Sequence, residues 1–276
     1  MKIGDIELDL KTPVVMTIVN VTPDSFFGGS RTVDRTAVER RIVEAVSEGC
    51  AMIDIGGYST RPGAAPVDPE EEFRRVSLGV EAARAIAPNL PLSIDTFRAS
   101  VVRRILDRFG PCIVNDISSG MLDPEMIATV ASYGVPYIAM HSKGDPQTMQ
   151  QLTEYEDLRR EIETFFIERI AALDRAGVKE VVLDPGFGFA KTTEQNYRLL
   201  GCLGSFRALG RPLLAGLSRK SMIYRPLGIS PDEALNGTTA LHWECLRQGV
   251  SILRVHDTRA AVETVRLYEC YKQALA

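Results

Sequence analysis

Polar side chains stand at the ends of short apolar runs along this sequence, and one group of them has the types needed to hold a ring. The group combines carboxylates, an amide and an ammonium. Carboxylates accept adjacent N–H groups, while an amide and an ammonium can donate to neighbouring acceptors. Such a set suits the edge of a flat heterocycle, for example a guanidine-like edge held by a carboxylate. Its members are Asp95, Asn115, Asp184 and Lys220.

A second group offers cationic and hydroxyl donors, which suit phosphate. In the stretch DIGGYSTRPGA, residues 54–64, an apolar run stops at two glycines and is followed by Thr60 and Arg61. Near the end of the chain Arg254 and His256 are two residues apart, so in an extended strand both side chains point the same way. A lone histidine is more often structural, but the neighbouring arginine favours anion binding for His256.

The other two histidines give no comparable signal. His242 lies in a helical pattern and is predicted to be structural, whereas His141 follows an apolar run and either role stays open. The three histidines show no spacing such as HxxxH, which argues against a zinc site.

The stretch GFGFAK, residues 186–191, superficially resembles a phosphate-binding loop. It lacks the full GxGxxG or GxxxxGK[ST] pattern, so it is a weak nucleotide signal. We interpret it instead as a place where the backbone approaches a ligand closely at Gly188, with Phe189 available to pack on a ring.

The elements that must position these residues can be predicted from eight apolar, β-branched runs. The runs are continuous rather than alternating, which is typical of parallel strands buried on both faces. They cover residues 14–20, 51–55, 90–95, 112–116, 135–140, 181–184, 212–217 and 250–255.

Segments with helical periodicity separate the apolar runs. Residues 69–87 and 157–177 both repeat apolar side chains at helical spacing, and Gly177 is expected to end the second helix. The last stretch predicts a final helix with Asp257 or Thr258 as its N-cap. Eight strands alternating with helices predict a (β/α)₈ TIM barrel. We expect one domain over residues 1–276, with a short N-terminal extension over residues 1–13.

The connections differ between the two ends of the predicted barrel. Those from helix to strand are short and marked by glycine, whereas those from strand to helix are long and rich in polar residues. The second class forms the carboxyl-end face, where active sites of barrels lie. A single strand-end aspartate can simply cap a helix, but seven or eight polar strand ends that all converge on one mouth predict a site. The strand-end residues are Asn20, Asp54, Asp95, Asn115, Asp116, Met140, His141, Asp184, Ser218, Arg219, Lys220, Arg254 and His256.

Asn20 ends the first predicted strand and offers a neutral oxygen. In a barrel the last strand closes against the first, so Arg254 and His256 should lie near Asn20 and not far from Arg61. A neutral oxygen beside phosphate donors is a usual arrangement for magnesium. The sequence therefore predicts a Mg²⁺ ligand at Asn20.

Composition limits the partners and the compartment. The 276 residues carry a net charge of −4, so no global basic field indicates nucleic acid or an anionic membrane. No apolar run approaches the roughly 18 residues of a membrane span, and the start of the chain does not resemble a signal peptide. The five cysteines are widely spaced and unpaired in pattern, which favours free thiols in a reducing cytoplasm.

Taken in order along the chain, these motifs resemble those of the dihydropteroate synthase family, and the resemblance runs nearly end to end. It implies a transferase of the folate pathway that joins 6-hydroxymethyl-7,8-dihydropterin pyrophosphate to p-aminobenzoate, with Mg²⁺, and releases pyrophosphate. It also implies a homodimer and a target of sulfonamides. The motifs are NVTPDSF, DIGGYSTRPGA, SIDTFRASV, VNDIS, MHSKGDPQTMQ, LDPGFGFAKTTEQN, GLSRKSMI, NGTTA and RVHD.

The resemblance also implies a role for each site residue. The pterin site would comprise Asp95, Asn115, Asp184 and Lys220, with Met140, Gly188 and Phe189 as its walls. Pyrophosphate and magnesium would be held by Asn20, Arg61, Arg254 and His256. The p-aminobenzoate would lie among Thr60, Arg61, Pro62, Ser218 and Lys220. The residues closest to the chemistry would be Arg61, Lys220, Arg254 and His256.

Some residues depart from the family pattern, and two other functions compete. Tyr58 stands where the family commonly has glutamate, Ser142 where methionine is frequent, and Ala190 where glycine is common. A pterin-dependent methyltransferase would share the ring site but would not need the STRPGA loop. A non-catalytic pterin-binding protein could keep the ring site and lose the residues that suit phosphate. Those residues are all present in this sequence.

Overall fold

The fold is built around a ring of eight parallel strands. A computed structural model describes residues 1–22, 34–59 and 65–275. The sheet has the order β8-β7-β6-β5-β4-β3-β10-β9, and a parallel bridge between Leu183 and Leu213 joins its two edges. The strands are β3 (Val14–Asn20), β4 (Met52–Gly56), β5 (Leu92–Asp95), β6 (Ile113–Asp116), β7 (Tyr137–Met140), β8 (Val181–Asp184), β9 (Leu214–Ala215) and β10 (Ile252–Val255).

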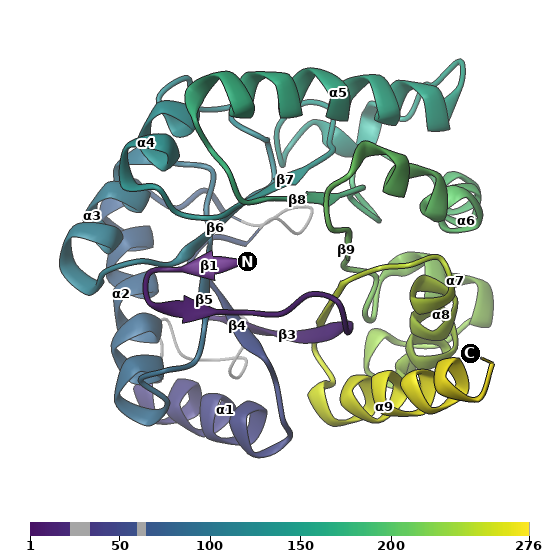
Figure 1. The fold of residues 1–276 in the computed structure, drawn as a ribbon, viewed down its shortest axis with the longest axis horizontal. Coiled ribbons are helices and arrows are strands. Elements are labelled where there is room, and N and C mark those ends of the chain that lie inside the picture. The colour runs from purple at the N-terminus through teal and green to yellow at the C-terminus, as the bar shows by residue number, and fades with distance from the viewer. Residues whose placement is uncertain (23–33, 60–64, 276) are drawn as a thin grey trace.

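Helices surround this ring on its outer face (Figure 1). A helix follows each strand, as the alternating pattern predicted, so the TIM-barrel prediction is confirmed. Among the described residues, no helix has the length and apolarity that a membrane crossing requires. The helices are α1 (Arg35–Ser47), α2 (Pro69–Ile86), α3 (Ala99–Phe109), α4 (Met126–Tyr133), α5 (Leu158–Ala176), α6 (Thr193–Cys202), α7 (Ser221–Leu227), α8 (Leu235–Arg247) and α9 (Thr258–Ala274), with short 3₁₀ turns η2 (Met149–Gln151), η3 (Leu203–Leu209) and η4 (Pro231–Glu233).

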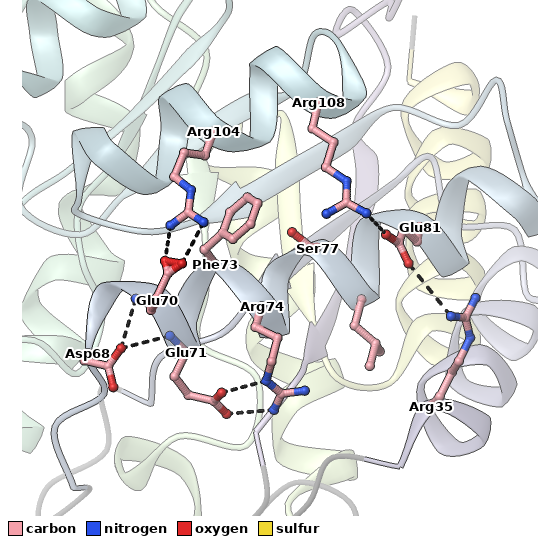
Figure 2. A pocket seen from close by; sticks show the side chains of 11 residues that line it. Arg35, Asp68, Glu70, Glu71, Phe73, Arg74, Ser77, Glu81, Arg104 and Arg108 are labelled. Carbon is pink, nitrogen blue, oxygen red and sulfur yellow. Dashed lines mark hydrogen bonds and ion pairs between the residues drawn. The ribbon is translucent and has the colours of Figure 1, made fainter.

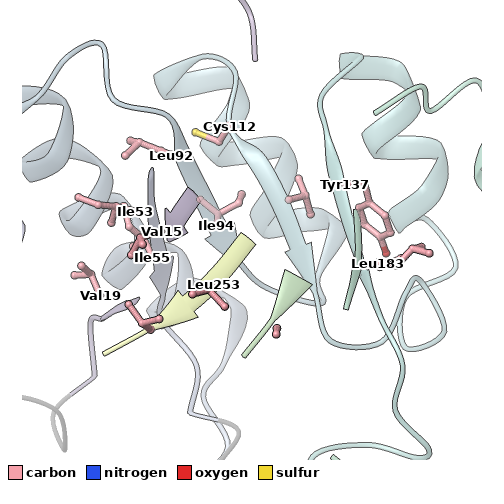
Figure 3. Close-up of a cluster of buried hydrophobic side chains, with 14 of the residues drawn as sticks. Val15, Val19, Ile53, Ile55, Leu92, Ile94, Cys112, Tyr137, Leu183 and Leu253 are labelled. Atoms are coloured by element: carbon pink, nitrogen blue, oxygen red, sulfur yellow. The ribbon is translucent and has the colours of Figure 1, made fainter. Parts of the chain in front are cut away.

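Two buried clusters fill the space on the two sides of the strands. The larger lies between strands and helices, and side chains such as Ile53, Ile94 and Leu183 point into it (Figure 3). The smaller lies inside the barrel and is made of the first inward residues of the strands, including Met16, Met52 and Ile252. Because successive strand residues alternate between faces, the inward positions beyond this smaller cluster are free to build a site.

The N-terminal extension closes the end of the barrel at which the strands begin. Strands β1 (Lys2–Ile3) and β2 (Ile6–Glu7) pair as an antiparallel hairpin, and β1 lies at the centre of the ring in Figure 1. Ile3 is buried in the inner apolar cluster, and Leu8 and Leu10 pack against it. The extension therefore covers the amino-terminal mouth and leaves the carboxyl-end mouth for chemistry.

Candidate active site

Arg254 lies at the centre of the polar residues inside the barrel. Its Nε donates to Oδ2 of Asp54 and its Nη2 donates to Oδ2 of Asp95, both at 2.6 Å. The strands β10, β4 and β5 supply these three side chains, so one guanidinium links three strands across the barrel. Burial by itself lowers the pKa of Arg254, but the charges of the two aspartates outweigh it and raise the pKa.

Asp54 also fixes the orientation of Asn115. The Nδ2 of Asn115 donates to Oδ2 of Asp54 at 3.0 Å, the same oxygen that receives Arg254. This leaves the carbonyl oxygen of Asn115 as an acceptor on the other side of the amide. The fully buried Asp54 therefore determines which groups Arg254 and Asn115 present to the mouth.

Asp184 and Lys220 lie on the opposite side of the mouth. Oδ1 of Asp184 accepts the backbone N–H of Gly186 at 2.8 Å. Nζ of Lys220 donates to the backbone oxygen of Phe187 and lies 4.5 Å from the ring centroid of Phe189. Burial raises the pKa of Asp184, whereas burial lowers the pKa of Lys220 to about 8 against the opposing charge of Asp184.

The turn after β8 comes close to these groups because it contains glycines with positive φ. Gly186 has φ 71°, and a Cβ there would lie 2.0 Å from the backbone oxygen of His141. Gly188 has φ 78°, and a Cβ there would lie 3.1 Å from Cδ of Lys220. The backbone at Gly188 therefore passes close to Lys220. The approach to a ligand that the stretch GFGFAK suggests stays a prediction. The buried Met140 ends β7 beside Gly186.

Asn20 lies beside Asp95, across a glycine. A Cβ on Gly56 would be 3.4 Å from Oδ1 of Asn20 and 3.8 Å from Oδ2 of Asp95. Strand β10 pairs with β3, with Arg254 opposite Met16, as barrel closure predicted. Burial raises the pKa of Asp95 to about 7, and the charge of Arg254 opposes this shift.

His256 follows the end of β10 and is held through its backbone and its ring. Its N–H donates to Oγ of Ser218 at 3.2 Å, and its Nδ1 lies 3.2 Å from the same oxygen. Arg41 on α1 donates to the backbone oxygen of His256 at 2.5 Å. These contacts connect Ser218 and His256, two of the predicted site residues.

Three strand-end residues turn away from the mouth, so the prediction that all of them converge there is wrong. Asp116 accepts from the hydroxyl of Tyr137 at 2.6 Å, on the side of the strands that faces the helices. The ring of His141 packs against Phe165 of α5, with their centroids 4.9 Å apart. Asp116 and His141 each follow an inward-facing residue, so alternation along the strand directs them outward.

Arg219 is the third residue that turns away. Its guanidinium pairs with the carboxylate of Asp257 at 2.6 Å and with Asp232 at 3.0 Å. Asp257 is the N-cap residue of α9, as predicted, but its side chain makes no cap hydrogen bond and pairs with Arg219 instead.

The sequence also predicted three site residues in the second strand-to-helix loop. Thr60, Arg61 and Pro62 lie outside the described residues. The sequence also assigned no chemical role to Asp54, although it named this residue as a strand end. The signal that was available is alternation: Asp54 is two residues before Gly56 and therefore faces inward, as Asn20 and Asp95 do on the neighbouring strands.

A cavity of about 610 Å³ lies away from the mouth, on the outer surface at α2 and α3 (Figure 2). Its arginines pair with glutamates: Arg104 with Glu70, and Arg108 with Glu81 at 2.7 Å. Because these charges neutralise each other within the cavity wall, we place the candidate site at the barrel mouth instead.

Known proteins of one family are similar to this chain over nearly its whole length. The family model described as pterin binding enzyme matches residues 16–256. The dihydropteroate synthase of Escherichia coli strain K12 is 41% identical over 266 residues, which are 95% of this chain and 93% of that protein.

Two solved structures are similar throughout. The Yersinia pestis dihydropteroate synthase, solved with a sulfonamide drug complex, has a TM-score of 0.93 and 37% identity, covering 99% of both chains. The Xanthomonas albilineans dihydropteroate synthase, solved with 4-aminobenzoic acid, has a TM-score of 0.88 and 39% identity, covering 96% of this chain and 95% of that one.

Proposed function

This chain belongs to the dihydropteroate synthase family of pterin-binding enzymes, and from that membership we propose how its own residues carry out the reaction. The activity is a transfer in folate synthesis: 6-hydroxymethyl-7,8-dihydropterin pyrophosphate and p-aminobenzoate give 7,8-dihydropteroate and pyrophosphate. The observation that carries the assignment of residues is the charge cluster at the mouth. Three carboxylates (Asp54, Asp95, Asp184) meet two cations (Arg254, Lys220) there.

The cluster suits a ring with several N–H donors on one edge. Asp184 has Oδ2 left for the ring after Oδ1 has accepted from Gly186, and Asn115 offers its carbonyl oxygen. Lys220 supplies a donor for a ring acceptor. We assign Asp95, Asn115, Asp184 and Lys220 to the pterin edge on this basis, and the faces of the ring to Met140, Gly188 and Phe189.

The reaction breaks the bond between the exocyclic methylene carbon and the pyrophosphate oxygen. Negative charge grows on the leaving pyrophosphate, and donors from Arg61, Arg254 and His256 stabilise it. Positive charge spreads from the methylene into the ring, where Asp95 and Asp184 favour it. The arylamine nitrogen then bonds to the same carbon and loses one proton. No protein nucleophile is needed, so catalysis comes from positioning and electrostatics.

Arg254 is shared between the two halves of this site. Its Nε and Nη2 are used by Asp54 and Asp95, so Nη1 is the nitrogen that we assign to pyrophosphate. The two aspartates hold the guanidinium in place before substrate arrives, which is the arrangement that favours a charge developing later.

Asn20 fits a role as a magnesium ligand in part. Its Oδ1 is a neutral oxygen near the Asp95 carboxylate, and magnesium prefers oxygen ligands and keeps several waters. In the described parts of the chain no cluster of three or more acidic, histidine or cysteine side chains could hold a metal. Asn20 would therefore be one ligand beside pyrophosphate oxygens and water. Bound Mg²⁺ would add positive charge next to the leaving group.

The p-aminobenzoate is assigned to Thr60, Arg61, Pro62, Ser218 and Lys220. The 4-aminobenzoic acid in the Xanthomonas albilineans structure supports a binding site of this kind. Ser218 contacts His256, and Lys220 contacts the ring of Phe189. Both pairs border the mouth, so we assign the arylamine to a position beside them, from which it attacks the methylene carbon.

Two wider assignments complete the proposal. We assign a homodimer through α8 and α9, where Trp243 packs edge-on against Tyr268 and where Leu267 and Tyr271 are exposed. Sedimentation at the mass of one 30.4 kDa chain would exclude it.

We assign the protein to the reducing cytoplasm because its five cysteines are free. Disulfides in the protein isolated from cells would contradict this assignment.

Pyrophosphate release tests the function directly. Purified protein is mixed with the dihydropterin pyrophosphate and Mg²⁺, with and without p-aminobenzoate, and pyrophosphate is measured. Release should depend on p-aminobenzoate and should fall when Mg²⁺ is chelated. A protein that binds the pterin and never releases pyrophosphate would be the non-catalytic alternative, and release that is indifferent to chelation would remove the magnesium assignment.

Lys220 should set the alkaline side of the pH profile. Burial lowers the pKa of its ammonium to about 8, so the charged donor is present below that pH and is lost above it. We expect kcat/KM for the pterin substrate to fall roughly tenfold per pH unit above about pH 8. Steady-state kinetics across that range measure the effect. Lys220→Met should have a lower plateau without this decline; a decline that persists in Lys220→Met would belong to another group.

A further inference from the structure

Lys191 places a buried ammonium behind the turn that forms one wall of the proposed pterin site. Its Nζ donates to the backbone oxygens of Gly186 at 3.0 Å and Phe189 at 3.1 Å. The third neighbour is Nδ1 of His141, at 3.1 Å. We propose that Lys191, with His141 as its partner, is a positioning residue that fixes the turn of residues 186–190 against the substrate ring. The proposal rests on the proposed function.

The three neighbours match the three protons of an ammonium. A charged lysine has three N–H donors and no acceptor, so one N–H can point to each of the two backbone oxygens and one to the ring nitrogen. Burial lowers the pKa of the Lys191 ammonium to about 7, and below that pH the charged lysine can only donate, so Nδ1 of His141 accepts and the ring proton lies on Nε2. Burial, followed by the charges of Lys191 and Lys143, lowers the pKa of His141 to about 2, so the ring stays neutral and able to accept. The histidine whose role the sequence left open is therefore a partner of the lysine.

The turn needs such a clamp because its backbone conformation is unfavourable by itself. Gly186 and Gly188 adopt positive φ without strain, but Ala190 has φ 49° although it is not glycine. A left-handed non-glycine residue persists only where its surroundings hold it. Lys191 follows Ala190 directly and ties both ends of the turn, at Gly186 and at Phe189, to one nitrogen.

The turn lies between two lysines that bind different carbonyl groups of its backbone. Lys191 takes the oxygens of Gly186 and Phe189 from behind, while Lys220 takes the oxygen of Phe187 from the side of the mouth. Asn196 accepts the N–H of Gly188 at 2.7 Å. Shifting the turn would therefore move Lys220 and the ring of Phe189 together, and both are assigned to the pterin.

Lys191→Met tests the clamp in the full-length protein, because methionine keeps the length of the side chain and removes the donors. The backbone oxygens of Gly186 and Phe189 and Nδ1 of His141 would then lose the group that they share, and we expect the KM for the dihydropterin pyrophosphate to rise roughly tenfold or more while the KM for p-aminobenzoate changes little. Equilibrium binding of the free dihydropterin, measured by fluorescence, should weaken by the same factor. Thermal unfolding shows whether the variant is folded.

Lys143→Met is the matched control. Lys143 lies after the same strand as His141, but it is partly exposed and pairs with Glu161 at 3.0 Å and with the ring of Tyr155. We expect both KM values of this variant to stay near those of the wild type. Equal losses for both substrates in Lys191→Met, or unchanged pterin binding, would overturn the proposal.

His141 provides a second test that does not depend on the folding of Lys191→Met. Asparagine can place an oxygen near the position of Nδ1 and accept from Lys191, whereas leucine cannot. His141→Asn should bind the dihydropterin within about threefold of the wild type, and His141→Leu several-fold more weakly than His141→Asn. Equal binding by the two variants would contradict the role of His141. Failure of pyrophosphate release by the wild type would refute the proposed activity and leave this comparison of ring binding intact.

Discussion

Arg254→Met should lower kcat/KM by about 10²–10³ and should also lower the free energy of unfolding by about 3–5 kcal/mol. The loss of activity follows from the removal of a preorganised donor for the leaving pyrophosphate. The loss of stability follows because Asp54 and Asp95 would keep their buried carboxylates without the cation that pairs with both. The charge of Arg254 also lowers the pKa of Asp95, so without it a larger fraction of Asp95 would be protonated and unable to bind the ring as a carboxylate.

Steady-state kinetics and urea unfolding of the same preparations separate these effects. Arg198→Met is a suitable control, because Arg198 forms an exposed ion pair with Glu194 on α6 and should change neither quantity by much. Arg254→Lys keeps a charge but cannot span two carboxylates as a planar fork does. We therefore expect it to recover more of the stability than of the activity. An Arg254→Met enzyme that is less stable yet turns over normally would make Arg254 a structural counter-ion only.

The barrel could be predicted from the sequence because its signals are local. Each strand is a continuous apolar run, and each helix repeats its apolar residues at helical spacing, so the order of elements follows directly. The shortest strand shows the limit. The run at residues 212–217 predicted a strand like the others, but β9 keeps only Leu214 and Ala215. A Cβ on the next residue, Gly216, would be 3.8 Å from Cβ of Arg254 and 4.0 Å from Oδ2 of Asp184. The backbone there has left the ladder and makes room for two site residues.

The candidate site was only partly predictable, because residue type does not tell which face of a strand a side chain occupies. Asn115 and Asp116 are neighbours of similar polarity, yet one bonds to Asp54 inside the barrel and the other to Tyr137 outside. Hydrogen-bond partners that come from distant strands are equally hard to predict from the sequence. Nothing local in the sequence indicates that Arg254 pairs with Asp54, 200 residues away. Buried polar groups need partners, but the fold decides which ones they find.

Asp184→Asn is the sharpest test of how the ring is recognised, because the change keeps the shape and reverses the hydrogen-bonding sense of one atom. The oxygen of the new amide can still accept the N–H of Gly186, which Oδ1 of Asp184 accepts at 2.8 Å. The amide nitrogen then faces the ring, so an N–H of the amide meets an N–H of the ring. In the wild type the same ring N–H meets a carboxylate oxygen, which accepts it. We expect kcat/KM for the pterin substrate to fall about 10²-fold or more, with binding of p-aminobenzoate little changed.

The same substitution should change both ring preference and pH dependence. A pteridine with an oxygen in place of the exocyclic amine presents an acceptor, so Asp184→Asn should discriminate against it less than the wild type does. Asp184 also raises the pKa of Lys220 against the effect of burial. Removing its charge should therefore move the alkaline decline to below about pH 8. If Asp184→Asn weakens both rings equally and leaves the pH profile in place, Asp184 serves the turn at Gly186 and does not bind the ring edge.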